Sequence, residues 1–105
     1  MGPIESIILE KLERSFSPSY IEVINESDSH NVPKGSESHF KVILVSQEFE
    51  GKTAVKRHQS VYSVLAHELQ SGVHALALHT YLPDEWKKQD SVPSSPNCLG
   101  GSKKG

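Results

Sequence analysis

Residues 71–86, SGVHALALHTYLPDEW, combine a helix end, a turn, a short apolar strand and the start of another helix. Gly72 stands where the C-terminal glycine of a helix is expected, and residues 75–81 read as a strand. Pro83 and the two acidic residues after it are typical of a first helical turn. His74 therefore lies where the backbone changes direction, a position from which an imidazole can face a partner or a metal.

A helical pattern leads into this segment, over residues 53–69. Apolar residues recur on one of its faces at helical spacing: Val61, Val64, Leu65 and Leu69. Residues 40–45, FKVILV, form a nearly continuous apolar run that is typical of the most buried strand of a sheet. We expect this run to be the central strand.

The first part of the chain adds one helix and one strand. Residues 4–16 alternate apolar and charged side chains at spacings that predict an amphipathic helix, and residues 20–24, YIEVI, predict a strand. Residues 26–38 are polar and connect this strand to the central one. Hairpin connections usually have about two to five residues, and longer ordered loops are often functional. His30 lies in this long loop.

The expected order is therefore α-β-β-α-β-α, an α/β (α+β) fold with a three-stranded mixed sheet and helices packed on it. The first two strands pair antiparallel through the loop, and the helical crossover allows the third to pair in parallel with the second. That arrangement places His74, His39 and His30 at one end of the sheet. An antiparallel third strand would move His74 to the opposite end.

Length and composition limit the organisation of the chain. Its 105 residues suffice for one domain, which we expect over residues 1–88, followed by a disordered tail, residues 89–105, rich in Ser, Pro, Gly and Lys. A net charge of −2 argues against a surface that is basic throughout, as in many nucleic-acid-binding proteins. No apolar run reaches the about 18 residues of a membrane span. We see no signal or transit segment before the first helical pattern, and a mitochondrial form would have lost its transit segment.

Cysteine and histidine content allows a shared metal site, although histidines in loops are often merely solvated. The single cysteine, Cys98, excludes an internal disulfide framework and indicates a reducing, intracellular compartment. His74 and His30 are the histidines expected outside helices and strands at the same sheet end, with His39 as a possible substitute for His30. Two histidines are too few for a closed zinc site, but two imidazoles can hold one iron of a two-iron cluster when thiolates hold the other. A partner would then have to supply the sulfur. The remaining histidines are expected to pack or to be solvated: His58, His67 and His79.

Other chemistry finds less support. The chain has no nucleophile elbow, no phosphate-binding glycine loop and no dinucleotide fingerprint, so we expect no enzymatic activity. A basic turn at the start of the helix over residues 53–69 has no acidic neighbour in sequence and allows contact with DNA phosphates. The acidic balance of the chain favours an ordinary solvated helix face over contact with nucleic acid. The cations are Lys52, Lys56 and Arg57.

Several segments, in order and at matching spacing, resemble the BolA-like family. They are GSESHF at 35–40, FEG at 49–51, RHQSVY at 57–62, EL at 68–69, VHAL at 73–76 and PDEW at 83–86. Residues 25–33 and 98–104 resemble, more narrowly, the first BolA-like paralogue of animals, which is mitochondrial. The resemblance covers nearly the whole predicted domain.

This resemblance implies a fold akin to the type II KH domain and a heterodimer with a monothiol glutaredoxin. In such heterodimers a two-iron two-sulfur cluster is bridged, with the glutaredoxin cysteine and glutathione on one side and histidines matching His74 and His30 on the other. It implies a role in iron–sulfur cluster assembly or delivery, in mitochondria or alternatively in the cytosol. The isolated protein would be a monomer without a cluster.

Bacterial relatives act as transcription regulators, which is the alternative function that the resemblance implies. The Gly-x-x-Gly loop with which KH domains clamp nucleic acid is missing from this sequence, so RNA binding of that kind is not expected.

Overall fold

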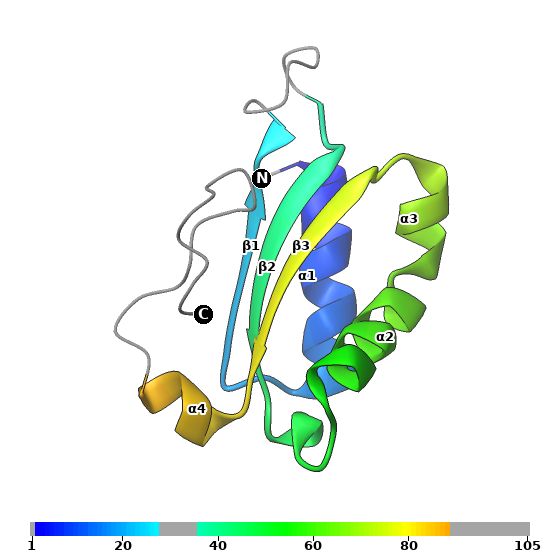
Figure 1. Cartoon of the computed structure of the whole chain (residues 1–105). Coiled ribbons are helices and arrows are strands. Elements are labelled where there is room, and N and C mark those ends of the chain that lie inside the picture. Colours follow the sequence, from blue (N-terminus) through cyan, green and yellow to red (C-terminus); the bar gives the residue numbers. More distant parts are fainter. Residues whose placement is uncertain (1, 28–35, 89–105) are drawn as a thin grey trace, which may run out of the picture.

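The structure is a computed structural model that describes residues 2–27 and 36–88. Figure 1 shows a three-stranded sheet with one long helix behind it and two further helices beside it. The predicted order of helices and strands is confirmed. The elements are α1 (Pro3–Phe16), β1 (Tyr20–Asn25), β2 (His39–Val45), the 3-10 turn η2 (Gln47–Phe49), α2 (Ala54–Val64), α3 (Ala66–Ser71), β3 (Ala75–Tyr81) and α4 (Pro83–Lys87).

The sheet has the predicted topology, with β2 at its centre in the order β1-β2-β3. β1 runs antiparallel to β2, and Tyr20 pairs with Val45. β3 runs parallel to β2, and His39 pairs with Ala75. Because parallel strands start at the same end of a sheet, the residue before β3 lies beside the first residue of β2.

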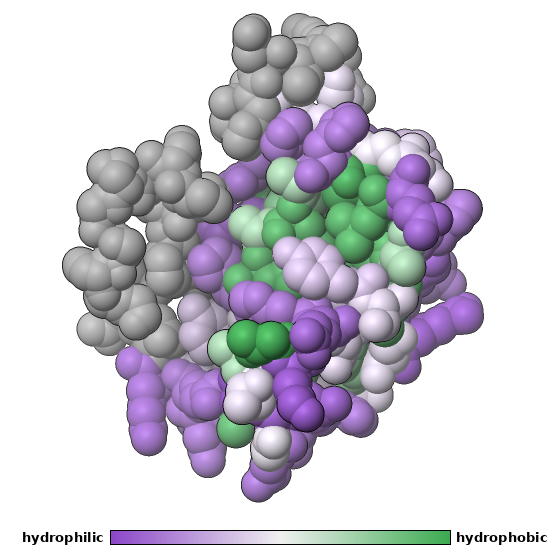
Figure 2. Space-filling model, turned by 45° about the vertical axis from the view of Figure 1, so that its right-hand side comes forward, coloured by the Kyte–Doolittle hydropathy of each residue, from purple (hydrophilic) through white to green (hydrophobic). Residues whose placement is uncertain are grey.

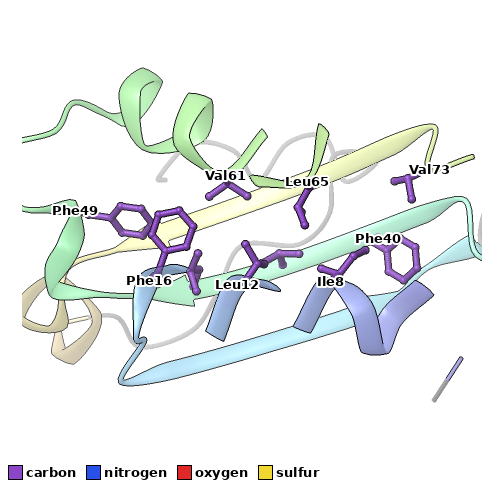
Figure 3. Close-up of a cluster of buried hydrophobic side chains, with 10 residues drawn as sticks. Ile8, Leu12, Phe16, Phe40, Phe49, Val61, Leu65 and Val73 are labelled. Atoms are coloured by element: carbon purple, nitrogen blue, oxygen red, sulfur yellow. The ribbon is translucent and has the colours of Figure 1, made fainter. Parts of the chain in front are cut away.

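The hydrophobic core lies between the sheet and the helices. Figure 3 shows Phe16 at the end of α1 facing Phe49 of η2, with ring centroids 5.3 Å apart. The face of β2 that carries Phe40, Val42 and Leu44 is buried against α1, in agreement with the continuous apolar run that predicted a central strand. The remaining buried residues of this cluster are Ile8, Leu12, Val61, Leu65 and Val73.

The helix predicted over residues 53–69 is interrupted. α2 ends at Val64, and Leu65 adopts φ −100° and ψ 17°, outside the helical range, before α3 begins. The Leu65 side chain is buried in the core, so the chain changes direction without leaving the apolar face. The apolar spacing continues through the break, which is why it predicted a single helix.

At the opposite end of the sheet from His39 and His74, α4 is attached by aromatic contacts. Trp86 stacks on Tyr20 of β1 at 5.1 Å between ring centroids, and it contacts Tyr81 of β3 at 5.2 Å. The Glu85 carboxylate accepts the N–H of Leu82 and so caps the short helix. No helix in the described residues is long and apolar enough to cross a bilayer.

Candidate metal-binding site

The structure brings His74 and His39 together, as the topology predicts. Their ring centroids are 6.3 Å apart, with the ring planes at 43°. His39 is the first residue of β2 and is half-buried, whereas His74 immediately precedes β3 and is exposed. The end of the sheet where both strands begin therefore presents two imidazoles to solvent or to a partner.

The backbone around His74 is fixed on both sides. Gly72 ends α3 with φ 143°, a conformation that residues with a side chain rarely adopt. Val73, which is buried, donates its N–H to the carbonyl of Glu68 at 3.1 Å. The N–H groups of His74 and Ala75 both donate to the carbonyl of Ser38, at 2.8 and 3.2 Å. His74 is therefore attached to the residue that precedes His39.

Ser38 also contacts His39 directly. Its hydroxyl lies 2.8 Å from Nδ1 of the imidazole, and the Ser38 side chain is almost fully buried. His39 in turn accepts the N–H of Glu26 at its carbonyl, at 2.8 Å, which joins the start of β2 to the residue after β1.

A second serine holds the segment that enters β2. Ser27 is only 1% exposed, and its hydroxyl accepts the N–H groups of Ser38 and His39 at 2.9 and 3.1 Å. The Asn25 side chain accepts the Ser27 N–H at 2.9 Å and donates to the Ser36 carbonyl at 3.0 Å. Sequence reasoning missed both serines, and the available signal was Asn25-x-Ser27, a spacing at which Asn side chains bond their own backbone.

The other predicted ligand, His30, lies outside the described residues, as does Cys98. His30 as a ligand therefore stays a prediction, and so does the tail over residues 89–105. Within residues 2–27 and 36–88, no group of three or more His, Cys, Asp or Glu side chains is arranged to hold a metal. Two neighbouring imidazoles fit one part of a shared ligand set and not a complete closed site.

Of the remaining histidines, His67 is exposed on α3, as expected. Burial, together with the neighbouring Arg57 charge, lowers the pKa of His58. Burial also lowers the pKa of His79 on β3, and Lys41 and His58 add to the effect while Glu26 opposes it. These two imidazoles are therefore biased toward the neutral form by their surroundings.

The basic turn differs from the prediction, because Arg57 has an acidic partner. Its guanidinium donates to both carboxylate oxygens of Glu85 at 2.8 and 3.3 Å, and its side chain is only 12% exposed. Its Nε donates to the Lys52 carbonyl, and the guanidinium lies 5.8 Å from the Phe49 ring centroid. The hydrogen bonds from Arg57, and after them the bond from the Leu82 N–H, lower the pKa of Glu85. Arg57 thus joins α2 to α4, and the sequence could not show this because the two residues are 28 positions apart in the chain.

A pocket of about 190 Å³ lies between the first turns of α1 and the end of α3. It includes Gly72 and Val73, the two residues before His74. Figure 2 shows apolar surface bordered by hydrophilic side chains on the side of the molecule that carries β3, α2 and α3. The sequence did not predict this pocket, because its walls come from segments far apart in the chain. Its lining residues are Ile4, Ile7, Glu37, His67, Glu68, Ser71, Gly72 and Val73.

The chain matches known proteins along most of its length. Residues 12–85 match the family described as BolA-like protein. The chain is 53% identical over 102 residues to the DNA-binding transcriptional regulator BolA of Vibrio cholerae, covering 96% of each chain. It is 47% identical over 104 residues to BolA-like protein 1 of Homo sapiens, covering 99% of this chain and 76% of the relative.

Solved structures show the same fold. The solution structure of BolA1 protein from Mus musculus has a TM-score of 0.82 and 45% identity, covering 95% of this chain and 81% of the mouse chain. The BolA domain of SufE1 from Arabidopsis thaliana has a TM-score of 0.76 and 40% identity, covering 81% of this chain and 98% of that domain. Sequence, sheet topology and structural similarity agree: the chain belongs to the BolA-like protein family.

Proposed function

We propose that this protein is a non-enzymatic factor in iron–sulfur cluster assembly or delivery, which forms a heterodimer with a monothiol glutaredoxin. In this proposal, a two-iron two-sulfur cluster bridges the partners, with His74 and His30 as ligands from this chain and the glutaredoxin cysteine and glutathione on the other side. The observation that supports it best is the end of the sheet where the ring centroids of the exposed His74 and the half-buried His39 lie 6.3 Å apart.

The chemistry of the donors favours a cluster shared between proteins. Imidazoles ligate one iron of a two-iron cluster when thiolates hold the other, and such ligation raises the reduction potential. Cys98 is the only cysteine of the chain and cannot supply two thiolates, so in this proposal the partner provides the sulfur ligands. We expect the isolated protein to be a monomer without a cluster, which size-exclusion chromatography with iron analysis would test.

The main experiment reconstitutes the heterodimer from this protein, a monothiol glutaredoxin, ferrous iron, sulfide and glutathione. We expect a coloured complex, and we expect His74→Ala to change its visible absorption and circular dichroism. His67→Ala is the matched control, because His67 is an exposed histidine on α3. An unchanged spectrum and unchanged affinity for the glutaredoxin in His74→Ala would exclude His74 as a ligand.

A second pair of variants assigns the other ligand. His30→Ala and His39→Ala are compared in the same reconstitution, since the structure places only His39 next to His74. A spectral change in His30→Ala alone supports the proposed pair. A change confined to His39→Ala would assign that role to His39.

The alternative function is regulation of transcription through DNA contact, which similarity to the DNA-binding transcriptional regulators BolA of Vibrio cholerae and Escherichia coli supports. Lys52 and Lys56 are exposed at the start of α2, whereas Arg57 is paired with Glu85. If both lysines contact phosphates, the double variant Lys52→Ala with Lys56→Ala would reduce the salt slope of DNA binding by about 2. Absence of binding at low salt would exclude this function.

We place the protein in mitochondria, with the cytosol as the alternative. The similarity to animal BolA-like protein 1, at 47% identity in Bos taurus and Homo sapiens, supports this placement. Fractionation of cells that produce the full-length gene product would test it, and recovery only in the cytosolic fraction would contradict it.

A further inference from the structure

We infer that Ser38, held by the buried hydroxyl of Ser27, is a positioning residue that sets His39 and His74 relative to each other. Ser38 bonds both histidine-bearing residues, through its hydroxyl to the ring of His39 and through its carbonyl to the backbone of His74. Its importance for cluster binding rests on the proposed function, whereas its effect on the two histidines does not.

Three groups of Ser38 are used, and each has a different partner. The N–H donates to the Ser27 hydroxyl at 2.9 Å, the carbonyl accepts the His74 N–H at 2.8 Å, and the hydroxyl lies 2.8 Å from Nδ1 of His39. Ser27 binds the same segment twice, because its hydroxyl also accepts the His39 N–H at 3.1 Å. The two buried serines thus join three parts of the chain: the residues after β1, the start of β2 and the residue before β3.

The hydroxyl of Ser38 suits an imidazole that must present its other nitrogen to a metal. A serine hydroxyl can donate or accept, so the bond to Nδ1 can persist whichever ring nitrogen carries the proton. Histidines that bind metals almost always have their second ring nitrogen bonded to a fixed group, and this bond sets the ring orientation. Where His39 takes the place of His30 as second ligand, it would bind the metal through Nε2, because Ser38 holds Nδ1.

Ser27 fixes the segment that enters β2 through two hydrogen bonds to its hydroxyl. A hydroxyl that is 1% exposed must find its partners within the protein, and both N–H groups that it accepts belong to the segment entering β2. Replacing it with alanine would leave two N–H donors without that acceptor. The segment that carries Ser38 and His39 would then move relative to His74.

The first experiment uses the protein alone, with histidine-ring and amide nitrogen NMR at a pH where the imidazoles are neutral. Ser38→Ala removes only the hydroxyl, so we expect the His39 Nδ1 signal to shift while the His74 amide signal stays. Ser38→Thr retains a hydroxyl and should keep the wild-type Nδ1 signal. Ser27→Ala should shift both the His39 ring and the His74 amide signals. Ser63→Ala, on the exposed face of α2, is the matched control.

The second experiment measures cluster loss from the heterodimer with a monothiol glutaredoxin. We expect Ser27→Ala, which moves the Ser38 carbonyl that holds the His74 backbone, to lose the cluster on the order of tenfold faster, as for other groups that orient metal ligands. Ser38→Ala should do the same only where His39 takes the place of His30 as the second ligand. Ser38→Thr and Ser63→Ala should behave like the wild type. If His74→Ala also leaves the cluster unaffected, the proposed function fails, and the NMR experiment still decides the role of Ser38.

A folded Ser38→Ala protein with wild-type His39 ring signals would overturn the inference. If that variant does not fold, the wild-type protein alone tests the inference. A His39 Nδ1 signal typical of a nitrogen without a hydrogen bond would overturn the inference as well.

Discussion

The imidazole of His79 lies on β3 with its Nε2 buried, and no hydrogen-bond partner for that atom is present among residues 2–27 and 36–88. Burial disfavours the charged form and lowers the pKa of His79 below its ordinary value of 6.5, with Lys41 and His58 acting in the same direction. Above about pH 6.5, His79 is neutral in both the folded and the unfolded chain. Below that pH the unfolded chain takes up the proton first.

We therefore predict that the free energy of unfolding falls as the pH is lowered from about 6.5 toward the depressed pKa of His79. Urea unfolding of the wild type and of His79→Gln, at about pH 7.5 and about pH 5.5, measures the effect. The wild type should lose more stability than the variant, because glutamine does not titrate. Equal losses in both proteins would contradict the prediction.

Single residues differ in how well the sequence identified their roles. His39 and His74 were placed together because the parallel register of β2 and β3 follows from the crossover connection. Ser27 and Ser38 were not identified, because their hydrogen-bond partners come from the end of β1, the start of β2 and the turn before β3. These segments meet only in the folded protein. His30 stays a prediction.

At the level of elements, α1 and α3 are joined by a part-buried ion pair. Lys11 contacts both carboxylate oxygens of Glu68, at 2.8 and 3.0 Å, and the Glu68 side chain is 5% exposed. Lys11→Met removes the partner of a buried carboxylate and should cost about 1–3 kcal/mol of unfolding free energy. Urea unfolding measures this loss.

Arg14→Met is the control for that measurement. Its ion pair with Glu10 lies within α1, and both side chains are largely exposed, so its loss should cost only about 0.5 kcal/mol or less. Comparable losses for Lys11→Met and Arg14→Met would show that the pair between α1 and α3 contributes little.

α2 and α4 are joined by Arg57, and this contact gives a second prediction at the same scale. Arg57→Ala removes the bonds to Glu85 and the contact with Phe49, and we expect a loss of about 1–2 kcal/mol in thermal or urea unfolding. Lys56→Ala, one residue earlier and exposed, should change stability by less than about 0.5 kcal/mol. A larger effect for Lys56→Ala would contradict the structural role of Arg57.

The ends of the helices show what the spacing of apolar residues can and cannot predict. The helix over residues 4–16 was predicted to within one residue, since Pro3 suits a first helical position. The interruption at Leu65 was not predicted, because Leu65 keeps its place on the apolar face while its backbone leaves the helical range. Backbone direction depends on what α3 packs against, which spacing alone does not contain.

For the whole molecule, the position of β2 between two strands predicts an uneven distribution of local stability. Exposing its amides requires the loss of pairing on both sides, whereas α4 is five residues long and has no buried residue. In native-state hydrogen exchange followed by NMR, the amides of Val42 and Leu44 should exchange most slowly. The amide of Trp86 should exchange much faster. Similar protection in α4 and β2 would mean that the domain opens only as a single unit.

The overall topology could be predicted because few alternatives survive the rules of connection. A hairpin followed by a helical crossover leaves β2 in the centre, and its continuous apolar run agrees with that position. The pocket beside α1 and α3 could not be predicted, since its volume depends on how three segments meet.

The stacking of Trp86 on Tyr20 and Tyr81 has a practical consequence. Trp86 is the only tryptophan in the chain, so its fluorescence reports from a single known place, the end of the sheet opposite His39 and His74. The wavelength of its emission maximum should follow the docking of α4 and should not shift when the histidines bind a cluster, whereas the emission intensity falls because a cluster absorbs the emitted light. A titration that changes the cluster spectrum without shifting the tryptophan emission maximum therefore records binding without unfolding.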